Sequence, residues 1–504
     1  MNRSTQFSFF LFLIMAVALA TSTALKDHRL WLDEILSMIL LSEDSFTHRI
    51  QAITTGIDAN PPLFILLYSL FGRGELTLKI ISILFFAGGV SVISGYLSGL
   101  TKKPMLVFVL TLIIVALTSM NYNLSSQIRN YSLFLFLSAL YFTDLFRFVV
   151  NPKGRALLVR LSVWGMLLAF AHNFGLIYIA ASMGVLALLT LWAKDARYLS
   201  GVAVGLLIFC LWVVIWYPHF LIQADTGKPF GWIKLPTFTS FLVTVDSLLP
   251  RIPVLSETSL YIIIPKVLAF AGFFLAGLWR SLKAGFRETF RDPVRITFLA
   301  SALLFWMVFA LTLLISFGFT PIFYSRYFWP SHLLVIVQIV YLCRNSPVVA
   351  MPRFYPYLIG IFAISAGAYL FRQNRKVTLF PDYLETLSKA IPARFPVFFE
   401  TGSDFLTADY YGLSDAHYLL NWKVSLKNHD TLGFKIIGAI QREYDKGEVV
   451  SELSFTKDRF PRFYVVDKTS HHLFEQYIDS GVLRVRSVKG GAVAGYRILE
   501  CEWQ

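Results

Sequence analysis

The chain has 504 residues, of which 56% are hydrophobic and only 15% are charged, and its mean hydropathy is +0.61. Soluble globular domains carry about 25% charged residues, so this composition excludes that class and predicts a protein that spans a membrane many times. The net charge of +14 comes from Lys and Arg residues that lie between the hydrophobic runs rather than in one basic tract, which argues against a nucleic-acid partner.

The first hydrophobic segment covers residues 7–24 and follows Arg3. Its small residues also fit a cleaved signal peptide, but its length allows it to remain as a first span, and we expect the latter. The next segment, residues 25–75, holds the adjacent acids Asp33 and Glu34 and, further on, Asp58. A helix of about eight or nine residues at about 1.5 Å each reaches only roughly 12 Å beyond the bilayer core, so Asp33 lies where a lipid phosphate would be.

Hydrophobic runs separated by polar breaks predict about eleven spans, near residues 7–24, 76–98, 104–120, 131–149, 156–171, 174–192, 199–217, 261–279, 296–318, 331–343 and 355–371. With a cytoplasmic N-terminus, the inside loops hold about sixteen Lys and Arg residues and the longer outside loops about eleven, as the positive-inside rule requires. This orientation places residues 25–75 and the C-terminal region on the outer face. Residues 61–71 are apolar but short, which predicts a helix in the membrane interface.

After residue 371 the composition becomes that of a soluble domain. Short apolar runs at residues 396–399, 463–466 and 496–499 predict strands, with helix-like stretches between them. The fold class predicted from the sequence is therefore an all-α polytopic membrane domain over residues 1–371, followed by a small extracytoplasmic α/β domain over residues 372–504.

Five short motifs together resemble a known family. They lie at residues 31–34 (WLDE), 58–64 (DANPPLF), 75–81 (ELTLKII), 126–133 (SQIRNYSL) and 325–330 (SRYFWP). The first three resemble the first-loop signature of the type C (GT-C) glycosyltransferases, membrane enzymes that use polyprenyl-phosphate sugars. The protein O-mannosyltransferase-like and lipid A aminoarabinose transferase-like members look most similar. The motifs depart from the family at Asn60, where His is usual, and at Ile128, where Glu is frequent.

The resemblance implies a glycosyltransferase that moves a hexosyl or pentosyl unit from a polyprenyl-phosphate carrier to a glycan, lipid or protein acceptor, with inversion. It implies that Asp33 is the general base, with Glu34 beside it as an orienting or solvated acid. Asp33 also fits the alternative of a helix-capping carboxylate. Asp58 fits either a second acid that binds the acceptor or a divalent cation, or an ordinary turn with Asn60.

A leaving phosphate requires cationic donors, and a guanidinium can bind it through two parallel hydrogen bonds. Arg129 and Arg326 are each followed closely by a tyrosine, and anchoring in the membrane interface is the alternative role for both. His172 and Asn173 interrupt a long apolar stretch, which predicts a turn between two spans rather than a catalytic pair. The predicted substrate-binding residues are Asp58, Asn60, Lys79, Arg129, Tyr131, Arg326 and Tyr327.

Two other functional classes fit parts of the sequence. A flippase or transporter of lipid-linked saccharide would carry ionisable residues inside its spans and repeated halves, whereas these spans contain almost no acids and no repeat is evident. A non-catalytic relative that binds glycan would fit the departures at Asn60 and Ile128. The location that we expect is the bacterial inner membrane, with the C-terminal domain in the periplasm.

Overall fold

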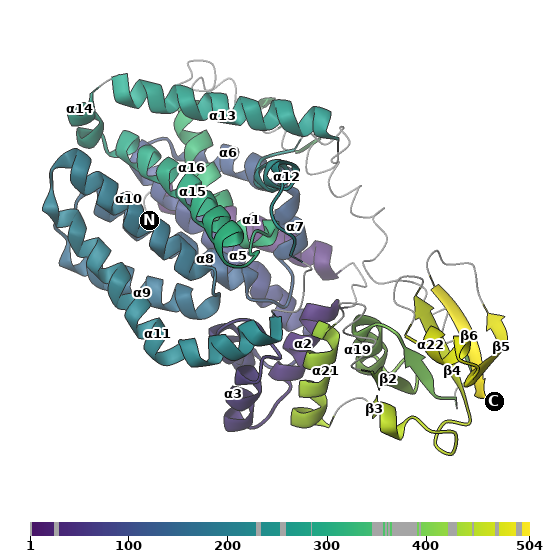
Figure 1. Cartoon of the computed structure of the whole chain (residues 1–504). Helices are drawn as coiled ribbons and strands as arrows, with labels where there is room; N and C mark the ends of the chain where they lie inside the picture. Colours follow the sequence, from purple (N-terminus) through teal and green to yellow (C-terminus); the bar gives the residue numbers. More distant parts are fainter. Residues whose placement is uncertain are drawn as a thin grey trace. The chain divides into compact units, whose positions relative to one another are not determined.

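A computed structural model of the chain describes residues 3–24, 30–227, 233–251, 259–283, 285–344, 356–357, 360, 363–364, 391–392, 395–421, 431–445, 448–468, 473–489 and 496–504. The chain divides into two compact units (Figure 1). One, the membrane unit, comprises Met1–Lys26, Asn60–Tyr217 and Ile233–Lys376. The other, the sheet unit, comprises Asp27–Ala59, Pro218–Trp232 and Val377–Gln504.

Long apolar helices form most of the membrane unit. Within the described residues, seven helices have the length and composition to cross a bilayer: α1 (Arg3–Ala24), α5 (Glu75–Thr101), α8 (Tyr131–Val150), α10 (Gly175–Ala193), α11 (Leu199–Gly227), α13 (Leu260–Lys283) and α15 (Pro293–Gly318). The shorter elements are α4 (Leu63–Tyr68), η1 (Ser69–Phe71), α6 (Pro104–Leu117), α7 (Ser119–Leu124), α9 (Arg155–Ala171), η2 (Ala196–Tyr198), α12 (Phe238–Leu248), α14 (Phe286–Arg291), η3 (Ser325–Phe328) and α16 (Ser331–Arg344).

These helices confirm the predicted fold class and identify an integral membrane protein. Ten of the eleven predicted spans fall on helices, and the eleventh, residues 355–371, lies mostly outside the described residues. The count of eleven is not confirmed, because α6, α9 and α16 have only 14, 17 and 14 residues. The predicted interfacial segment at residues 61–71 forms α4 and η1.

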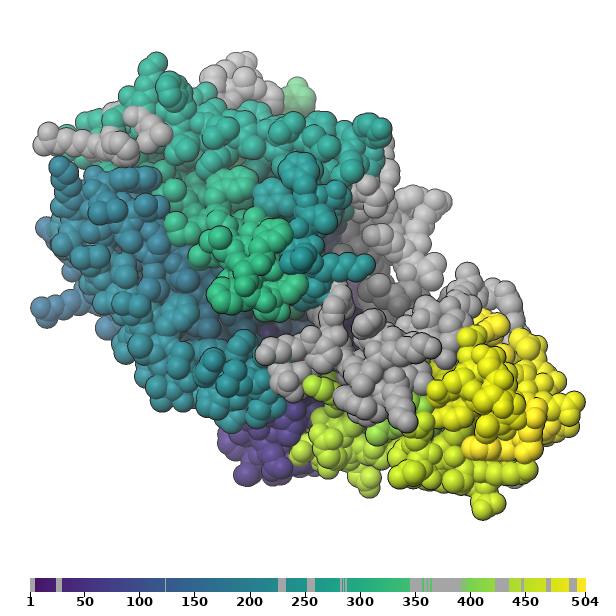
Figure 2. Space-filling view, in the orientation of Figure 1, coloured from purple at the N-terminus to yellow at the C-terminus, as the bar shows by residue number. Residues whose placement is uncertain are grey.

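The sequence explains how the helices end and how they pack. Lys102 adopts a left-handed conformation (φ 56°) that ends α5, and Pro104 then begins α6. Within α5, a Cβ atom on Gly89 would lie 2.7 Å from the Leu135 side chain and 3.1 Å from the Phe136 backbone, so glycine is what lets α5 and α8 approach closely. The outside of the unit is apolar as well: α13, visible in Figure 2, exposes Tyr261, Leu268, Phe273, Leu275 and Trp279.

The described residues of the sheet unit form a six-stranded sheet in the order β3-β2-β1-β4-β6-β5. Strands β1 (Val397–Phe399), β2 (Ala416–Leu420), β3 (Glu448–Ser451) and β4 (Arg462–Lys468) run parallel, whereas β5 (Leu483–Lys489) and β6 (Tyr496–Trp503) form antiparallel pairs. The three strands predicted from the sequence are β1, β4 and β6. The other elements after β1 are α19 (Gly402–Tyr410), α21 (Thr431–Tyr444), η5 (Glu452–Ser454) and α22 (Glu475–Asp479).

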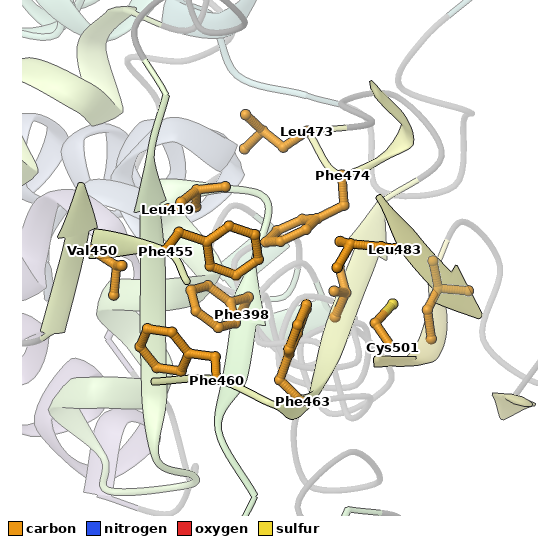
Figure 3. Close-up of a cluster of buried hydrophobic side chains, with 12 residues drawn as sticks. Phe398, Leu419, Val450, Phe455, Phe460, Phe463, Leu473, Phe474, Leu483 and Cys501 are labelled. Carbon is orange, nitrogen blue, oxygen red and sulfur yellow. The ribbon is translucent and has the colours of Figure 1, made fainter. Parts of the chain in front are cut away.

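An aromatic cluster forms the core of this sheet (Figure 3). The ring of Phe398 in β1 is fully buried, and its centroid lies 5.0 Å from that of Phe460, 5.2 Å from that of Phe463 and 5.5 Å from that of Phe474. The interplanar angles of 64–77° are those of edge-to-face pairs, the arrangement that aromatic quadrupoles favour.

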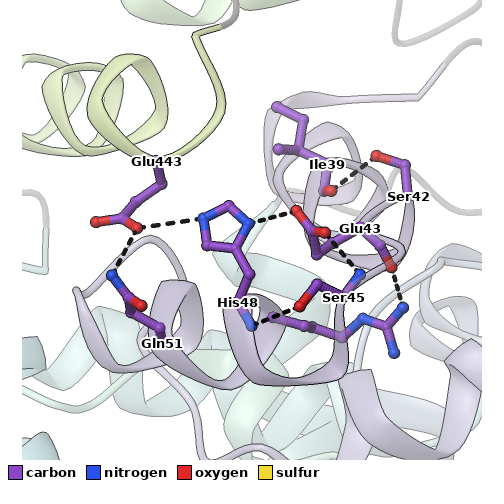
Figure 4. A network of polar contacts seen from close by, with 8 residues as sticks. Ile39, Ser42, Glu43, Ser45, His48, Gln51 and Glu443 are labelled. Atoms are coloured by element: carbon purple, nitrogen blue, oxygen red, sulfur yellow. Dashed lines mark hydrogen bonds and ion pairs between the residues drawn. The ribbon is translucent and has the colours of Figure 1, made fainter.

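The first part of the predicted outer loop folds with this sheet rather than with the spans. Its helices α2 (Leu32–Leu41) and α3 (Phe46–Thr54) belong to the sheet unit. The Leu30 N–H donates to the Tyr411 hydroxyl over 2.6 Å. His48 in α3 lies with one ring nitrogen 2.6 Å from Glu43 and the other 3.4 Å from Glu443 of α21 (Figure 4). The domain boundary at residue 371 stays a prediction.

Candidate functional site

The acids Asp33 and Glu34 lie in the first turn of α2. The Trp31 N–H donates to a Glu34 carboxylate oxygen over 3.4 Å, and Glu34 is buried, so this carboxylate helps to cap its own helix. Asp33 is half-buried, and its carbonyl accepts from the Ser37 hydroxyl over 3.1 Å. The two neighbouring acids therefore differ: Glu34 is enclosed by the fold, while part of Asp33 is open to the surroundings.

Asp58 follows α3 in an irregular segment that turns at Gly56, where φ is +90°. It is buried, and its carbonyl accepts from the Gln223 amide over 3.0 Å. Asp58 belongs with Asp33 and Glu34 to the sheet unit, whereas the chain enters the membrane unit at Asn60. Over the described part of the chain, no group of three or more His, Cys, Asp and Glu side chains could hold a metal ion. The divalent-cation role of Asp58 stays a prediction.

The remaining predicted residues all belong to the membrane unit. Arg129 lies just before α8, in a segment that is fixed from two sides. The Ser82 hydroxyl of α5 donates to the Gln127 carbonyl over 2.8 Å, and the Asn130 amide donates to the Ala171 carbonyl at the end of α9 over 3.1 Å. These bonds place Arg129, which is buried, next to the α9–α10 turn, and they connect its segment to the helix that carries the buried Lys79.

Arg326 lies in η3 among three tyrosines. Its guanidinium carbon is 4.8 Å from the ring centroid of Tyr324, 5.4 Å from that of Tyr131 and 5.9 Å from that of Tyr327. Cation–π attraction at these distances orients the guanidinium without neutralising its charge. The structure thus brings Tyr131 next to Arg326 and Tyr327, although the sequence places Tyr131 almost 200 positions before them.

His172 completes this cluster, although the sequence predicted only a turn there. Its ring centroid lies 5.2 Å from that of Tyr327 and 6.1 Å from that of Tyr131. Burial, and then the charges of Arg129 and Arg326, lower the pKa of His172 to about 3. These five residues, Arg129, Tyr131, His172, Arg326 and Tyr327, are hereafter the arginine site.

The turn that holds His172 depends on glycine. The Gly175 N–H donates to the His172 carbonyl over 2.7 Å, and a Cβ atom on Gly175 would lie 2.5 Å from the Leu168 carbonyl oxygen. The chain can therefore reverse direction between α9 and α10 only if residue 175 lacks a side chain. The sequence signal for this site was a histidine in a turn on the same predicted face as Arg129 and Arg326.

A second buried histidine shows the contrast with His172. His332 in α16 has its Nδ1 2.9 Å from the Leu248 carbonyl and its Nε2 3.1 Å from the Asn121 amide nitrogen. Asn121 in turn accepts from the Trp329 indole over 2.8 Å. Both nitrogens of His332 are used to fasten α16 to α7 and α12, so this residue has a structural role.

A polar hollow of about 770 Å³ lies in the sheet unit. Its lining includes Asp415, Asp445, Glu448 and Arg459, and none of the residues predicted from the sequence. The arginine site instead combines two guanidinium groups with aromatic walls. It is therefore suited to bind an anion such as a phosphate, through charge-assisted hydrogen bonds that are strong where water is scarce.

Comparison with known proteins bears on the fold. No family model matches the sequence, and no curated protein matches it. Among solved structures, that of ArnT from Cupriavidus metallidurans in the apo state aligns with 98% of this chain and 97% of its own, with a TM-score of 0.58 and 14% sequence identity. The chain has the fold of ArnT. This confirms the fold expected from the resemblance to lipid A aminoarabinose transferase-like, type C glycosyltransferases.

A second structure of ArnT from the same organism is bound to undecaprenyl phosphate. It aligns with 98% of this chain and 97% of its own, with a TM-score of 0.57 and 13% identity. The fold similarity therefore covers nearly all of both units.

Proposed function

We propose that the protein is an integral membrane glycosyltransferase that moves a sugar from a polyprenyl-phosphate carrier to an acceptor at the outer face of the membrane. The observation that carries the proposal is the arginine site, a pair of guanidinium groups with tyrosines around Arg326, in a chain with the fold of ArnT. Its location would be the bacterial inner membrane, with the sheet of residues 397–503 in the periplasm.

In the proposed reaction an acceptor hydroxyl or amine attacks the anomeric carbon of the carrier-linked sugar. Asp33 takes the proton from the acceptor, the bond from the anomeric carbon to the phosphate oxygen breaks, and polyprenyl phosphate leaves with the electron pair. A single displacement of this kind inverts the anomeric configuration. Arg129 and Arg326, with Lys79, stabilise the negative charge that develops on the leaving oxygen.

The local structure of α2 supports Asp33 rather than Glu34 as the base. The Glu34 carboxylate accepts a backbone hydrogen bond at the start of its helix and is buried, whereas Asp33 is only half-buried. A general base must come within hydrogen-bonding reach of its substrate, which favours the more accessible acid. Glu34 then supports the helix that presents Asp33, and Asp58 and Asn60 help to bind the acceptor.

The test is a transfer assay on the full chain reconstituted in lipid vesicles, with a panel of polyprenyl-phosphate hexoses and pentoses and with glycan, lipid and peptide acceptors. We expect sugar transfer by the wild type and a loss of about 10²- to 10⁴-fold in the Asp33→Asn variant. Asp44→Asn is the matched control, because Asp44 is an exposed acid close by in the same segment.

Three other outcomes would contradict parts of this proposal. Wild-type rates in Asp33→Asn would remove this residue from the mechanism. Movement of lipid-linked sugar across the bilayer without transfer would make the protein a flippase. Binding of the carrier without transfer or movement, for every sugar and acceptor in the panel, would make it a non-catalytic relative.

A further inference from the structure

The hydrogen bonds of His172 determine where its proton lies. The Phe174 backbone N–H donates to Nδ1 of His172 over 3.0 Å, so Nδ1 is an acceptor and carries no proton. In a neutral imidazole the proton then lies on Nε2, which becomes a donor. Within the residues that the structure describes, this Nε2 is buried and has no hydrogen-bond partner, and the whole residue is only 5% exposed.

The surroundings of the ring keep it neutral and leave its donor to be satisfied by a ligand. The groups that face it are the cations Arg129 and Arg326 and the rings of Tyr131, Tyr327 and Phe134, the last at a centroid distance of 4.8 Å. Burial and the two cations disfavour an imidazolium. A buried N–H without an acceptor is costly, and an anion held by the same two arginines would supply one.

We infer that the Nε2–H of His172 donates a hydrogen bond to a phosphate oxygen of the polyprenyl carrier, as a neutral donor beside Arg129 and Arg326. This inference rests on the proposed function, because it takes the phosphate of the carrier as the anion. The cationic residues supply charge, and His172 supplies a directed donor that adds no further positive charge. That distinction matters after transfer, since the product phosphate monoester is more anionic than the phosphodiester donor and each additional cation would hold it more tightly.

Two substitutions separate this role from a purely structural role in the turn. In His172→Asn the side-chain oxygen can still accept from the Phe174 N–H, but no donor reaches the position of Nε2. In His172→Gln the amide nitrogen can reach that position, while the acceptor for Phe174 is lost. A residue that only caps the turn would tolerate Asn and not Gln, and a phosphate ligand would show the opposite order.

The experiment measures the Kd for undecaprenyl phosphate of the full chain in lipid nanodiscs, for wild type, His172→Asn, His172→Gln and Arg326→Ala, together with Tm in the absence of added carrier. We expect His172→Asn to weaken binding by about 10- to 100-fold at nearly unchanged Tm, as is typical for loss of a hydrogen bond to a charged group. His172→Gln should bind within about threefold of wild type, even where its Tm is lower.

The wild-type to His172→Gln affinity ratio should also stay constant from pH 8 to pH 5. A ratio that rises below pH 6.5 would identify a charged imidazolium and overturn the neutral donor. Wild-type affinity in His172→Asn, with Arg326→Ala weakened, would overturn the inference alone and leave the proposed function standing. A wild-type protein that binds no undecaprenyl phosphate would overturn both.

Discussion

The two units of the molecule hold their candidate functional side chains in different ways. In the membrane unit, the arginine site forms where the ends of apolar helices meet, and hydrogen bonds such as that from Asn130 to Ala171 join segments 41 residues apart. In the sheet unit, Asp33 lies on a ten-residue helix, α2, whose first turn is capped by its own Glu34.

The difference follows from the surroundings of each unit. Apolar helices offer few polar partners, so a cation among them must be positioned by aromatic rings and by neighbouring helix ends, as Arg326 is by Tyr131 and Tyr327. A short helix such as α2 has capping groups close by in sequence. The proposed function places carrier binding in the membrane unit and proton transfer in the sheet unit, so substitutions should be able to separate the two functions.

The largest effect that we expect comes from the core of the sheet. Phe398→Ala removes a fully buried ring in contact with four other aromatic rings and should destabilise the sheet unit by about 3–5 kcal/mol. Urea titration followed by limited proteolysis measures this, with the exposed Val488→Ala as control. Affinity for undecaprenyl phosphate should stay within about twofold of wild type. A parallel loss of affinity would show that the arginine site depends on the sheet unit.

Substitutions at Arg326 test whether the membrane unit binds the carrier. Arg326→Ala should weaken undecaprenyl phosphate binding by about 10- to 100-fold, because it removes charge-assisted hydrogen bonds. Arg326→Lys should recover only part of the affinity, since an ammonium cannot make the bidentate contact. The control is Arg291→Ala, at a side chain that is 63% exposed. Equal affinity of the Arg326→Ala variant and wild type would remove Arg326 from the site.

The pH dependence of the membrane unit provides a third test. The pKa of His172 is lowered from 6.5 to about 3 in the folded protein, so below pH 6.5 the unfolded chain binds a proton that the folded chain does not. The contribution of His172 to the free energy of unfolding is therefore fully present above pH 6.5. It declines as the pH falls toward 3, by at most about 1.4 kcal/mol per pH unit. Tm measured at pH 6.5, 5.5 and 4.5 should fall less steeply in His172→Gln. Equal slopes would contradict the buried neutral ring.

The smallest effect concerns Glu43 in the sheet unit. The Ser45 N–H donates to its carboxylate over 2.8 Å, and His48 lies 2.6 Å away, so the pKa of Glu43 is lowered below its usual 4.5. Its contribution is present above pH 4.5 and is lost as the pH falls through the lowered pKa. Glu43→Gln should cost roughly 0.5–1 kcal/mol at pH 7 and less at pH 3. Urea unfolding at both pH values measures this, and an equal cost at pH 7 and pH 3 would contradict the lowered pKa.

The sequence was sufficient for the elements that depend on local patterns. Long hydrophobic runs located helices such as α5 and α15, and short apolar runs located β1, β4 and β6, because burial imposes a regular pattern on each. The same patterns did not determine the number of membrane spans, because α9 and α16 are apolar but short. Hydropathy alone cannot decide whether such a helix crosses the bilayer.

Interactions over long sequence distances were the part that could not be predicted. Nothing in residues 27–59 indicates that they fold with the C-terminal sheet, because their partners, such as Tyr411 for Leu30, lie 381 residues away. His172 was predicted as a turn residue, and it is one. Its second nitrogen is also buried beside Arg129 and Arg326. This burial depends on packing between helices, which cannot be recognised from the neighbouring residues in the sequence.

The most direct test of whether carrier binding and proton transfer are separate functions is to measure two quantities on one preparation of Asp33→Asn reconstituted in lipid. These are the Kd for undecaprenyl phosphate and the rate of sugar transfer. We expect a Kd within about twofold of wild type and a transfer rate lower by about 10²- to 10⁴-fold. A Kd that rises together with the loss of rate, or a rate that does not change, would contradict the assignment of binding to the membrane unit and of proton transfer to Asp33.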